Sequence, residues 1–256
     1  MNTVEVKCVS KWFDRRDGDQ LEVLRKINFD VPSQAIVALL GASGCGKSTL
    51  LNIIAGLIKP DRGAILLDGV SSANFRHWRS MTYMFQEDRL LPWRTAAQNV
   101  AFGLEAESLP QAERRRRACE TLSLVGLEGF EDVYPHELSG GMRSRVALAR
   151  SLVTEPTILL MDEPFSKLDP SIRAQMHAEV LRLAALRKMT VIFVTHDVEE
   201  AIVLADYVVV LHPRPGRVGE TRRIELPYPR DPLSADVAEE VRNLRLSLAG
   251  ARPVPC

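Results

Sequence analysis

Residues 41–49 read Gly41-Ala42-Ser43-Gly44-Cys45-Gly46-Lys47-Ser48-Thr49, between an apolar run at 35–40 and a helical pattern at 48–55. They match the phosphate-binding loop G-x-x-x-x-G-K-[ST] in its required place between a strand and a helix. The glycines let the backbone wrap around a phosphate, with N–H groups pointing inward. Lys47 places a positive charge at the β- and γ-phosphates, and the Ser48 hydroxyl can bind Mg²⁺. The alternative is a glycine turn that precedes a helix without binding phosphate. The position of the motif between a strand and a helix disfavours this alternative.

On both sides of this loop, short apolar strands alternate with longer helical patterns, which is typical of a largely parallel α/β sheet. Strands are predicted at 35–40, 157–161, 190–194 and 207–211. Helices are predicted at 48–55, 171–186 and 198–204. Between 86 and 155 the strand signal disappears and helical patterns dominate, including 111–125, so we expect a helical insert there. The tail after Pro227 predicts a loop and a short amphipathic helix with a frayed end.

The composition excludes several classes of protein. The 256 residues are 46% hydrophobic and 26% charged, which are ordinary globular values and argue against disorder. Thirty-three basic residues balance 33 acidic ones, so no net positive field favours broad nucleic-acid binding. The run Arg114–Arg117 is expected to be a solvated helix face, because Glu113 and Glu120 flank it.

Targeting and redox features indicate a protein of a reducing compartment. Apolar runs such as 36–40 and 190–194 are far shorter than the ~18–20 residues that span a bilayer. The N-terminus lacks the basic and apolar regions of a secretion signal. The four cysteines, Cys8, Cys45, Cys119 and Cys256, show no C-x-x-C spacing. We therefore expect reduced thiols, with neither a zinc site nor a disulfide framework.

A second chemical feature is the apolar strand Ile158-Leu159-Leu160-Met161, which ends in Asp162 and Glu163. Alternation along a strand points the two carboxylates in different directions. One could face Mg²⁺ and the other an attacking water. An acidic pair at a strand end is weak evidence of function by itself, but it becomes strong evidence in a chain that also carries a phosphate-binding loop.

The remaining motifs resemble those of the ATP-binding-cassette (ABC) proteins. Leu138-Ser139-Gly140-Gly141-Met142 resembles the family's signature motif, and its helix ends in Ala147-Leu148-Ala149-Arg150. Gln86, after Tyr83-Met84-Phe85, resembles the Q-loop. Ser166-Lys167-Leu168-Asp169 resembles the D-loop, and Thr195-His196-Asp197 resembles the switch-histidine region. The motifs occur in family order from about Val4 to Arg230, so the chain is identified as a member of this family.

This resemblance implies a fold and an assembly. The fold is the α/β nucleotide-binding domain of the P-loop NTPases, with a mainly parallel sheet, an antiparallel β subdomain and a helical α-subdomain. The domain would span 1–230, with the helical insert at 87–155 and a C-terminal extension at 231–256. Such domains act as head-to-tail homodimers that sandwich two ATP molecules with Mg²⁺. The cofactors implied are therefore ATP and Mg²⁺.

The resemblance also assigns roles to residues. Glu163 would be the general base or water-orienting carboxylate, His196 would contact the γ-phosphate, and Gln86 would reach Mg²⁺ and the water. Asp162 and Ser48 would bind Mg²⁺. The signature loop, at a helix N-terminus, would cap the nucleotide of the partner copy. Phe13 occupies the place of the adenine-stacking aromatic, although Trp12 is a competing candidate and a core position is an alternative.

Finer features are similar to the nitrate, sulfonate and taurine class of importers. They are the segments 85–93 and 99–104, Gly140–Arg143, Met161–Phe165, Pro215-Gly216 and Leu226-Pro227-Tyr228-Pro229-Arg230. They imply an ATPase subunit at the cytoplasmic face of the inner or plasma membrane. It would energise uptake of a small anionic solute, with a permease dimer and an extracytoplasmic solute-binding protein and without nucleic acid. A groove beside Gln86–Trp93 would receive the permease's coupling helix, unless Trp93 fills the core.

The sequence departs from the family motifs at two positions, and two other functions compete with that of an importer subunit. Ser144 replaces the usual Gln before Arg145, and Lys167 replaces a small D-loop residue. We expect two copies of Lys167 to repel each other across the dimer, weakening it and keeping idle hydrolysis low. The alternatives are a partner carboxylate or phosphate, or a lysine that points to solvent. The rival functions are a soluble ABC ATPase that acts on a macromolecular complex and a nucleotide-gated module that does not hydrolyse ATP.

Overall fold

The structure is a computed structural model that describes residues 2–15 and 18–250. It divides into two compact units. Unit 1 combines Met1–Arg76 with Thr190–Cys256, and unit 2 is His77–Met189. Cys256 and the expected frayed end of the C-terminal extension lie outside the described residues.

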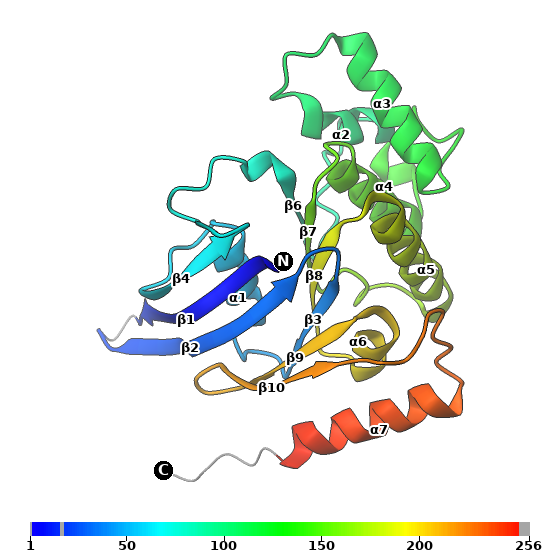
Figure 1. The fold of residues 1–256 in the computed structure, drawn as a ribbon. Helices are drawn as coiled ribbons and strands as arrows, with labels where there is room; N and C mark the ends of the chain where they lie inside the picture. The colour runs from blue at the N-terminus through cyan, green and yellow to red at the C-terminus, as the bar shows by residue number, and fades with distance from the viewer. Residues whose placement is uncertain (1, 16–17, 251–256) are drawn as a thin grey trace. The chain divides into compact units, whose positions relative to one another are not determined.

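Unit 1 contains an antiparallel sheet of four strands in the order β2-β1-β4-β5. Its strands are β1 (Asn2–Asp14), β2 (Gln20–Pro32), β4 (Arg62–Leu67) and β5 (Val70–Ser71). The three longer strands lie side by side (Figure 1). In β2, buried Ile27, Phe29 and Val31 alternate with exposed residues, so one face packs on the core and the other meets solvent. This confirms the antiparallel β subdomain.

Unit 1 also holds the strands around the phosphate-binding loop. Strand β3 (Ile36–Gly41) lies between β8 (Thr190–Thr195) and β9 (Tyr207–His212) and is parallel to both. Strand β10 (Arg217–Arg223) pairs antiparallel with β9. All residues of β3 and β8 are buried, as expected for parallel strands covered on both faces. The helices α1 (Lys47–Ile54) and α6 (Val198–Leu204) pack on these strands.

The C-terminal helix α7 (Ala235–Gly250) packs against α6. Its buried Val237, Val241 and Leu244 recur at helical spacing, so the predicted amphipathic helix is present. The motif at 226–230, which precedes this helix, is attached to the end of α6. Arg230 is only 6% exposed, and its guanidinium donates to the carbonyls of Ile202, Ala205 and Leu226. Because two of these carbonyls lie at the end of α6, Arg230 satisfies groups that a helix end leaves without partners.

Replacing Arg230 with Leu is expected to lower the free energy of unfolding by about 2–4 kcal/mol, because buried carbonyls lose a charged donor. Urea denaturation measures this change. Arg223→Leu is the matched control, since Arg223 is exposed on β10 of the same unit. A loss for Arg230→Leu no larger than the control's, within the roughly 0.5 kcal/mol typical of surface sites, would contradict the bonding assigned to this guanidinium.

Unit 2 contains the parallel pair β6 (Met81–Met84) and β7 (Ile158–Asp162), with Met84 opposite Met161. Residues 87–155, all of them described, contain helices and loops without a strand. The α-helices are α2 (Ala96–Ala101), α3 (Gln111–Leu124) and α4 (Gly140–Leu152). Short 3₁₀ turns occur at Trp78–Ser80, Phe102–Leu104 and Pro135–Glu137. Helix α5 (Pro170–Arg187) follows β7. The predicted helical segments at 111–125 and 171–186 match α3 and α5 to within a residue.

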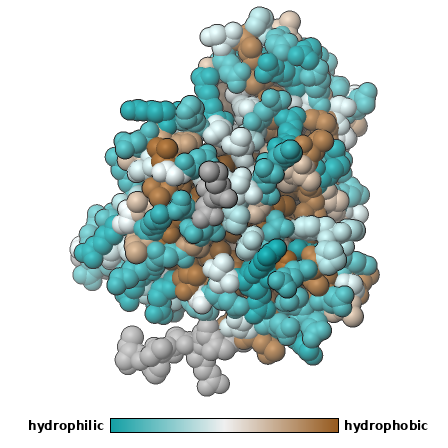
Figure 2. Space-filling model, viewed as in Figure 1, coloured by the Kyte–Doolittle hydropathy of each residue, from teal (hydrophilic) through white to brown (hydrophobic). Residues whose placement is uncertain are grey.

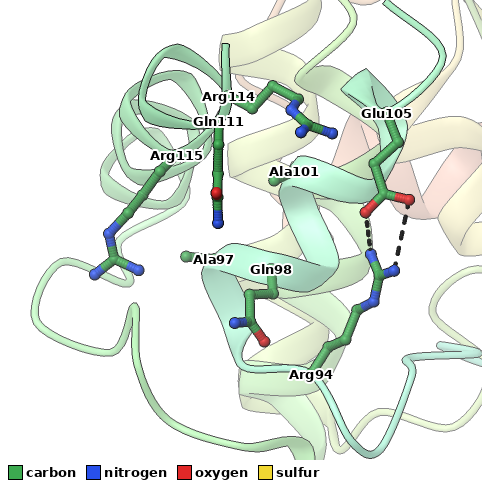
Figure 3. A pocket seen from close by; sticks show the side chains of 8 residues that line it. All are labelled: Arg94, Ala97, Gln98, Ala101, Glu105, Gln111, Arg114 and Arg115. Atoms are coloured by element: carbon green, nitrogen blue, oxygen red, sulfur yellow. Dashed lines mark hydrogen bonds and ion pairs between the residues drawn. The ribbon is translucent and has the colours of Figure 1, made fainter. Parts of the chain in front are cut away.

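The basic run on α3 divides into two pairs. Arg116 and Arg117 both donate to Glu113, and these hydrogen bonds lower the pKa of Glu113 to about 2. This half of the run is the solvated, charge-balanced face that the sequence predicts. Arg114 and Arg115 instead line a cavity of about 330 Å³ (Figure 3).

Hydrophilic residues cover most of the face seen in Figure 2, and apolar residues appear there in small groups. Within residues 2–15 and 18–250, none of the helices combines the length and the apolar character that crossing a membrane requires.

Candidate functional site

The phosphate-binding loop joins β3 to α1 in unit 1. Gly44 and Gly46 have φ values of +78° and +96°, in the left-handed region that favours glycine. A Cβ on Gly46 would come within 2.7 Å of the Leu24 side chain, so the loop requires glycine there for space as well. Gly46 is also the N-cap of α1, and no side chain caps this helix. N–H groups at the start of a helix can receive a bound anion.

Lys47 lies folded back onto this loop and is 4% exposed. Its Nζ is 2.7 Å from the Gly41 carbonyl and 3.0 Å from the Ala42 carbonyl. These contacts keep the ammonium inside the loop, where a phosphate can replace the carbonyls as its partner. Burial raises the pKa of the neighbouring Cys45 thiol, which therefore stays protonated at neutral pH.

The predicted switch histidine lies at the same sheet edge as this loop. Leu40 of β3 is paired with Thr195 of β8, so Gly41 and His196 follow at neighbouring strand ends. The Asp197 side chain caps α6 by accepting from the Glu199 amide, and the Asp197 amide donates to Thr195 Oγ1. The local fold thereby leaves His196 exposed beside the loop.

The two aromatic candidates for adenine differ in their surroundings. Phe13 is 39% exposed, so the core alternative for it is wrong. Trp12 is half-buried, with the Arg62 guanidinium 5.5 Å from its ring centroid. The Lys11 ammonium lies 5.3 Å from the Phe13 ring centroid. Phe13 thus offers the more accessible ring, and its stacking on adenine stays a prediction.

In unit 2, three predicted residues gather where β6 and β7 end. Gln86 Nε2 lies 3.3 Å from Glu163 Oε2 and 3.4 Å from Ser166 Oγ. The Ser166 hydroxyl donates to the Glu163 carbonyl at 3.0 Å. Glu163 has a φ of +44°, an uncommon conformation for a residue with a side chain and one often found at functional sites.

Asp162 accepts a hydrogen bond from the Tyr83 hydroxyl at 3.2 Å. Burial and the Asp162 charge raise the pKa of Tyr83, so the phenol stays protonated and acts as the donor. Oxygen ligands such as the Asp162 carboxylate, the Gln86 amide and the Ser48 hydroxyl suit Mg²⁺. No cluster of three His, Cys, Asp or Glu side chains forms a metal cage within residues 2–15 and 18–250. Mg²⁺ held with a nucleotide needs only one or two protein ligands, so the residues fit it.

The signature segment begins α4. Ser139 caps this helix by accepting from the Met142 amide at 3.2 Å, and Gly140 and Gly141 form its first turn. A Cβ on Gly141 would come within 2.7 Å of Ile172, so packing against α5 requires glycine at this position. The substituted Ser144 bonds back to the Gly140 carbonyl within the same helix.

The D-loop precedes α5, which Asp169 caps, while Leu168 is buried. Lys167 has a partner that the motifs do not indicate. Its Nζ lies 3.1 Å from Glu87 Oε1 of the same chain, although the two residues are 80 positions apart. The only sequence signal for Glu87 was a carboxylate directly after Gln86.

The residues after Glu87 are tied to the signature helix. Arg143 Nε lies 3.0 Å from Asp88 Oδ2, and the Arg150 guanidinium donates to the backbone carbonyls of Asp88 and Arg89. Burial lowers the pKa of Arg150, although an arginine remains charged at neutral pH. Segment 86–89 is therefore held both by the D-loop and by α4.

Trp93 is 71% exposed, so the alternative that it fills the core is wrong. Phe102 is also exposed, and the Arg94 guanidinium lies 5.2 Å from its ring centroid. Arg94 pairs with Glu105 at the rim of the cavity in Figure 3. Arg114 and Arg115 of α3 also line this cavity. The segment 93–102 therefore carries two exposed aromatic rings, and one of its residues, Arg94, lines a cavity together with two arginines of α3.

The sequence is similar to ATP-binding proteins of ABC transporters. The sequence profile of the family described as ABC transporter matches residues 24–166. The taurine import ATP-binding protein TauB of Rhizobium johnstonii is 42% identical over 93% of this chain and 95% of its own length. The aliphatic sulfonates import ATP-binding protein SsuB 1 of Xanthomonas axonopodis pv. citri is 44% identical over 90% of each chain. The nitrate import ATP-binding protein NrtC of Synechococcus elongatus is 40% identical over 95% of this chain and 37% of its own length.

Two solved structures are similar over nearly the whole chain. A dimeric ATP-binding cassette in a post-hydrolysis state with ADP and Pi has a TM-score of 0.77 at 30% identity, covering 88% of this chain and 100% of its own. The cbiO1 component of the cbiONQ ABC transporter complex of Clostridium perfringens has a TM-score of 0.78 at 30% identity. That match covers 97% of this chain and 96% of the other.

Proposed function

Because the chain belongs to the ABC transporter family of ATP-binding proteins, we propose that it is the ATPase subunit of an importer for a small anionic solute. The observation that carries the proposal is an identity of 40–44% to proteins named for the import of taurine, aliphatic sulfonates and nitrate. Sulfonate and nitrate groups are both oxoanions. The solute class is therefore a small molecule or ion with an oxoanion group.

In this function ATP is the substrate, and each residue of the site has a separate role. Lys47 would exchange the Gly41 and Ala42 carbonyls for phosphate oxygens, while the N–H groups of α1 receive the same phosphates. His196 would contact the γ-phosphate from the neighbouring strand end. Ser48 of unit 1, and Asp162 and Gln86 of unit 2, are the residues that we expect to hold Mg²⁺, which would supply positive charge against the phosphates when bound. Glu163 would orient the attacking water and accept its proton.

A homodimer is the second part of the proposal. The segment Leu138–Met142 presents a serine-capped helix start rich in glycine, which would serve as a second anion site. In a head-to-tail pair it would face the nucleotide of the other copy. The dimeric state of the similar ADP-bound cassette supports this arrangement.

The third part is a permease partner. The exposed rings of Trp93 and Phe102 belong to the same unit as Gln86 and come later in the chain, so a helix docked on them could act on the segment that holds Gln86. A permease dimer would place this chain peripherally at the cytoplasmic face of the inner or plasma membrane. A solute-binding protein would then deliver the solute on the opposite side. The exposed aromatic surface and the import names of the relatives favour this function over a soluble ABC ATPase.

The test is reconstitution of the chain with a permease and a solute-binding protein taken from the neighbouring genes. We expect ATP hydrolysis in proteoliposomes to rise when the binding protein is loaded with an alkylsulfonate, taurine or nitrate. Co-purification with a soluble complex, together with an absence of solute stimulation, would overturn the importer function. Phosphate release by the isolated chain separates both ATPase functions from the non-hydrolysing module.

Replacing Trp93 with Ala is expected to uncouple transport from hydrolysis. Because the side chain is 71% exposed, basal ATPase and folding stability should change little, while transport by the whole assembly falls. Leu186→Ala is the matched control, since Leu186 is a large exposed apolar residue of the same unit. Equal transport losses in both variants would contradict a docking role for Trp93.

A further inference from the structure

Two consecutive residues of the Q-loop contact the segment that contains Glu163 and the D-loop. The Gln86 amide reaches Glu163 Oε2 at 3.3 Å and Ser166 Oγ at 3.4 Å. Next to it, Glu87 Oε1 lies 3.1 Å from Lys167 Nζ. All these residues belong to unit 2, so the contacts form a double attachment between two loops of one compact unit.

The two attachments differ in strength. Hydrogen bonds of 3.3 and 3.4 Å are long for N–H···O and hold Gln86 loosely. The adjacent ion pair adds a charged contact that restricts the same backbone. An exposed ion pair is normally weak because two long side chains must be ordered. Here Arg150 already holds the backbone of Asp88 and Arg89, and Leu168 beside Lys167 is buried, so part of that ordering is already present.

We propose that Lys167 and Glu87 are positioning residues whose ion pair holds Gln86 against Glu163 and so keeps basal ATP hydrolysis low. The Gln86 amide contacts one carboxylate oxygen of Glu163, the side chain proposed to orient water. The proposal rests on the role proposed for Glu163, and it assigns a function to the lysine that distinguishes this D-loop. It is an alternative to the repulsion expected from the sequence, because Glu87 balances the Lys167 charge within the same chain.

The two explanations predict opposite effects for one substitution. If the pair restrains Gln86, Glu87→Gln and Lys167→Ala both release it and both raise the basal rate. If copies of Lys167 repel each other across a dimer, Lys167→Ala raises the rate, whereas Glu87→Gln exposes the charge and lowers it. The sign of the Glu87→Gln effect therefore separates them.

The experiment measures steady-state ATPase of the full-length chain at low salt and at 1 M salt. We expect Lys167→Ala, Glu87→Gln and the double variant each to raise kcat about two- to fivefold, the range for an exposed pair, with KM for ATP unchanged. The charge swap Lys167→Glu with Glu87→Lys should restore the low rate. High salt should raise the wild-type rate toward the variants', because it screens the pair.

Glu155→Gln is the matched control, since Glu155 is an exposed glutamate of unit 2 whose partner, Arg187, lies 3.4 Å away. It should leave kcat unchanged. The proposal is overturned if both single variants keep the wild-type kcat, if their effects multiply in the double variant, if the swap does not restore the low rate, or if Glu87→Gln slows hydrolysis. An active Glu163→Gln variant would instead overturn the role of Glu163, so the two failures are distinguishable.

Discussion

Replacing Glu163 with Gln is expected to lower ATP turnover by about 10²–10⁴-fold, the usual contribution of a general base, while ATP binding persists. The amide preserves the size of the side chain but cannot accept the proton from water. It also removes a negative charge that would repel the γ-phosphate. We therefore expect ATP to hold the variant as a stable homodimer.

Size-exclusion chromatography with and without ATP and Mg²⁺ measures the dimer, and phosphate release measures turnover. Glu155→Gln serves as the control for removing an exposed glutamate from the same unit. A Glu163→Gln protein that stays monomeric with ATP, or that hydrolyses it at nearly the wild-type rate, would exclude this carboxylate as the base.

Replacing Lys47 with Ala is expected to weaken ATP binding itself by about ten- to a hundredfold. A charge-assisted contact to phosphate contributes roughly 1.5–3 kcal/mol, which corresponds to that range. The reason is local, since the ammonium lies within the loop and has carbonyls that a phosphate can replace.

Isothermal titration calorimetry measures the affinity, and circular dichroism checks that the variant folds. Lys59→Ala is the matched control, because Lys59 is an exposed lysine of the same unit. An unchanged affinity in a folded Lys47→Ala protein would show that this lysine does not contact the phosphates.

Much of the fold around the nucleotide site was predictable because the information is contiguous. The phosphate-binding loop needs a buried strand before it and a helix after it, and β3 and α1 lie within a residue of their predicted limits. Asp162 is the last residue of β7 and Glu163 follows it, while His196 follows β8, and both strands contain an unbroken apolar run, at 158–161 and 191–194. Parallel strands buried on both faces produce such unbroken apolar runs, so their ends can be located without tertiary information.

The exposure of single aromatic residues was less predictable. Trp93 and Phe13 have large apolar rings that would suit a core position, but both side chains are exposed. A pattern indicates which residues are apolar, but burial depends on whether another element covers them. Arg230 shows the reverse case, because a charged residue is buried where carbonyls from the end of α6 and from Leu226 converge on it.

The motifs by themselves determined the family, the substrate ATP and the residues expected to act on it, because each motif is a short run whose chemistry is local. Only the tertiary structure decided which charges meet. Lys167 and Glu87 are 80 positions apart, and Arg143 and Asp88 are 55 apart. Side chains this distant become partners only when strands and helices bring their loops to the same edge of a unit. Coulomb attraction between exposed charges falls off over about 10 Å in salt, so it acts after the fold has placed them.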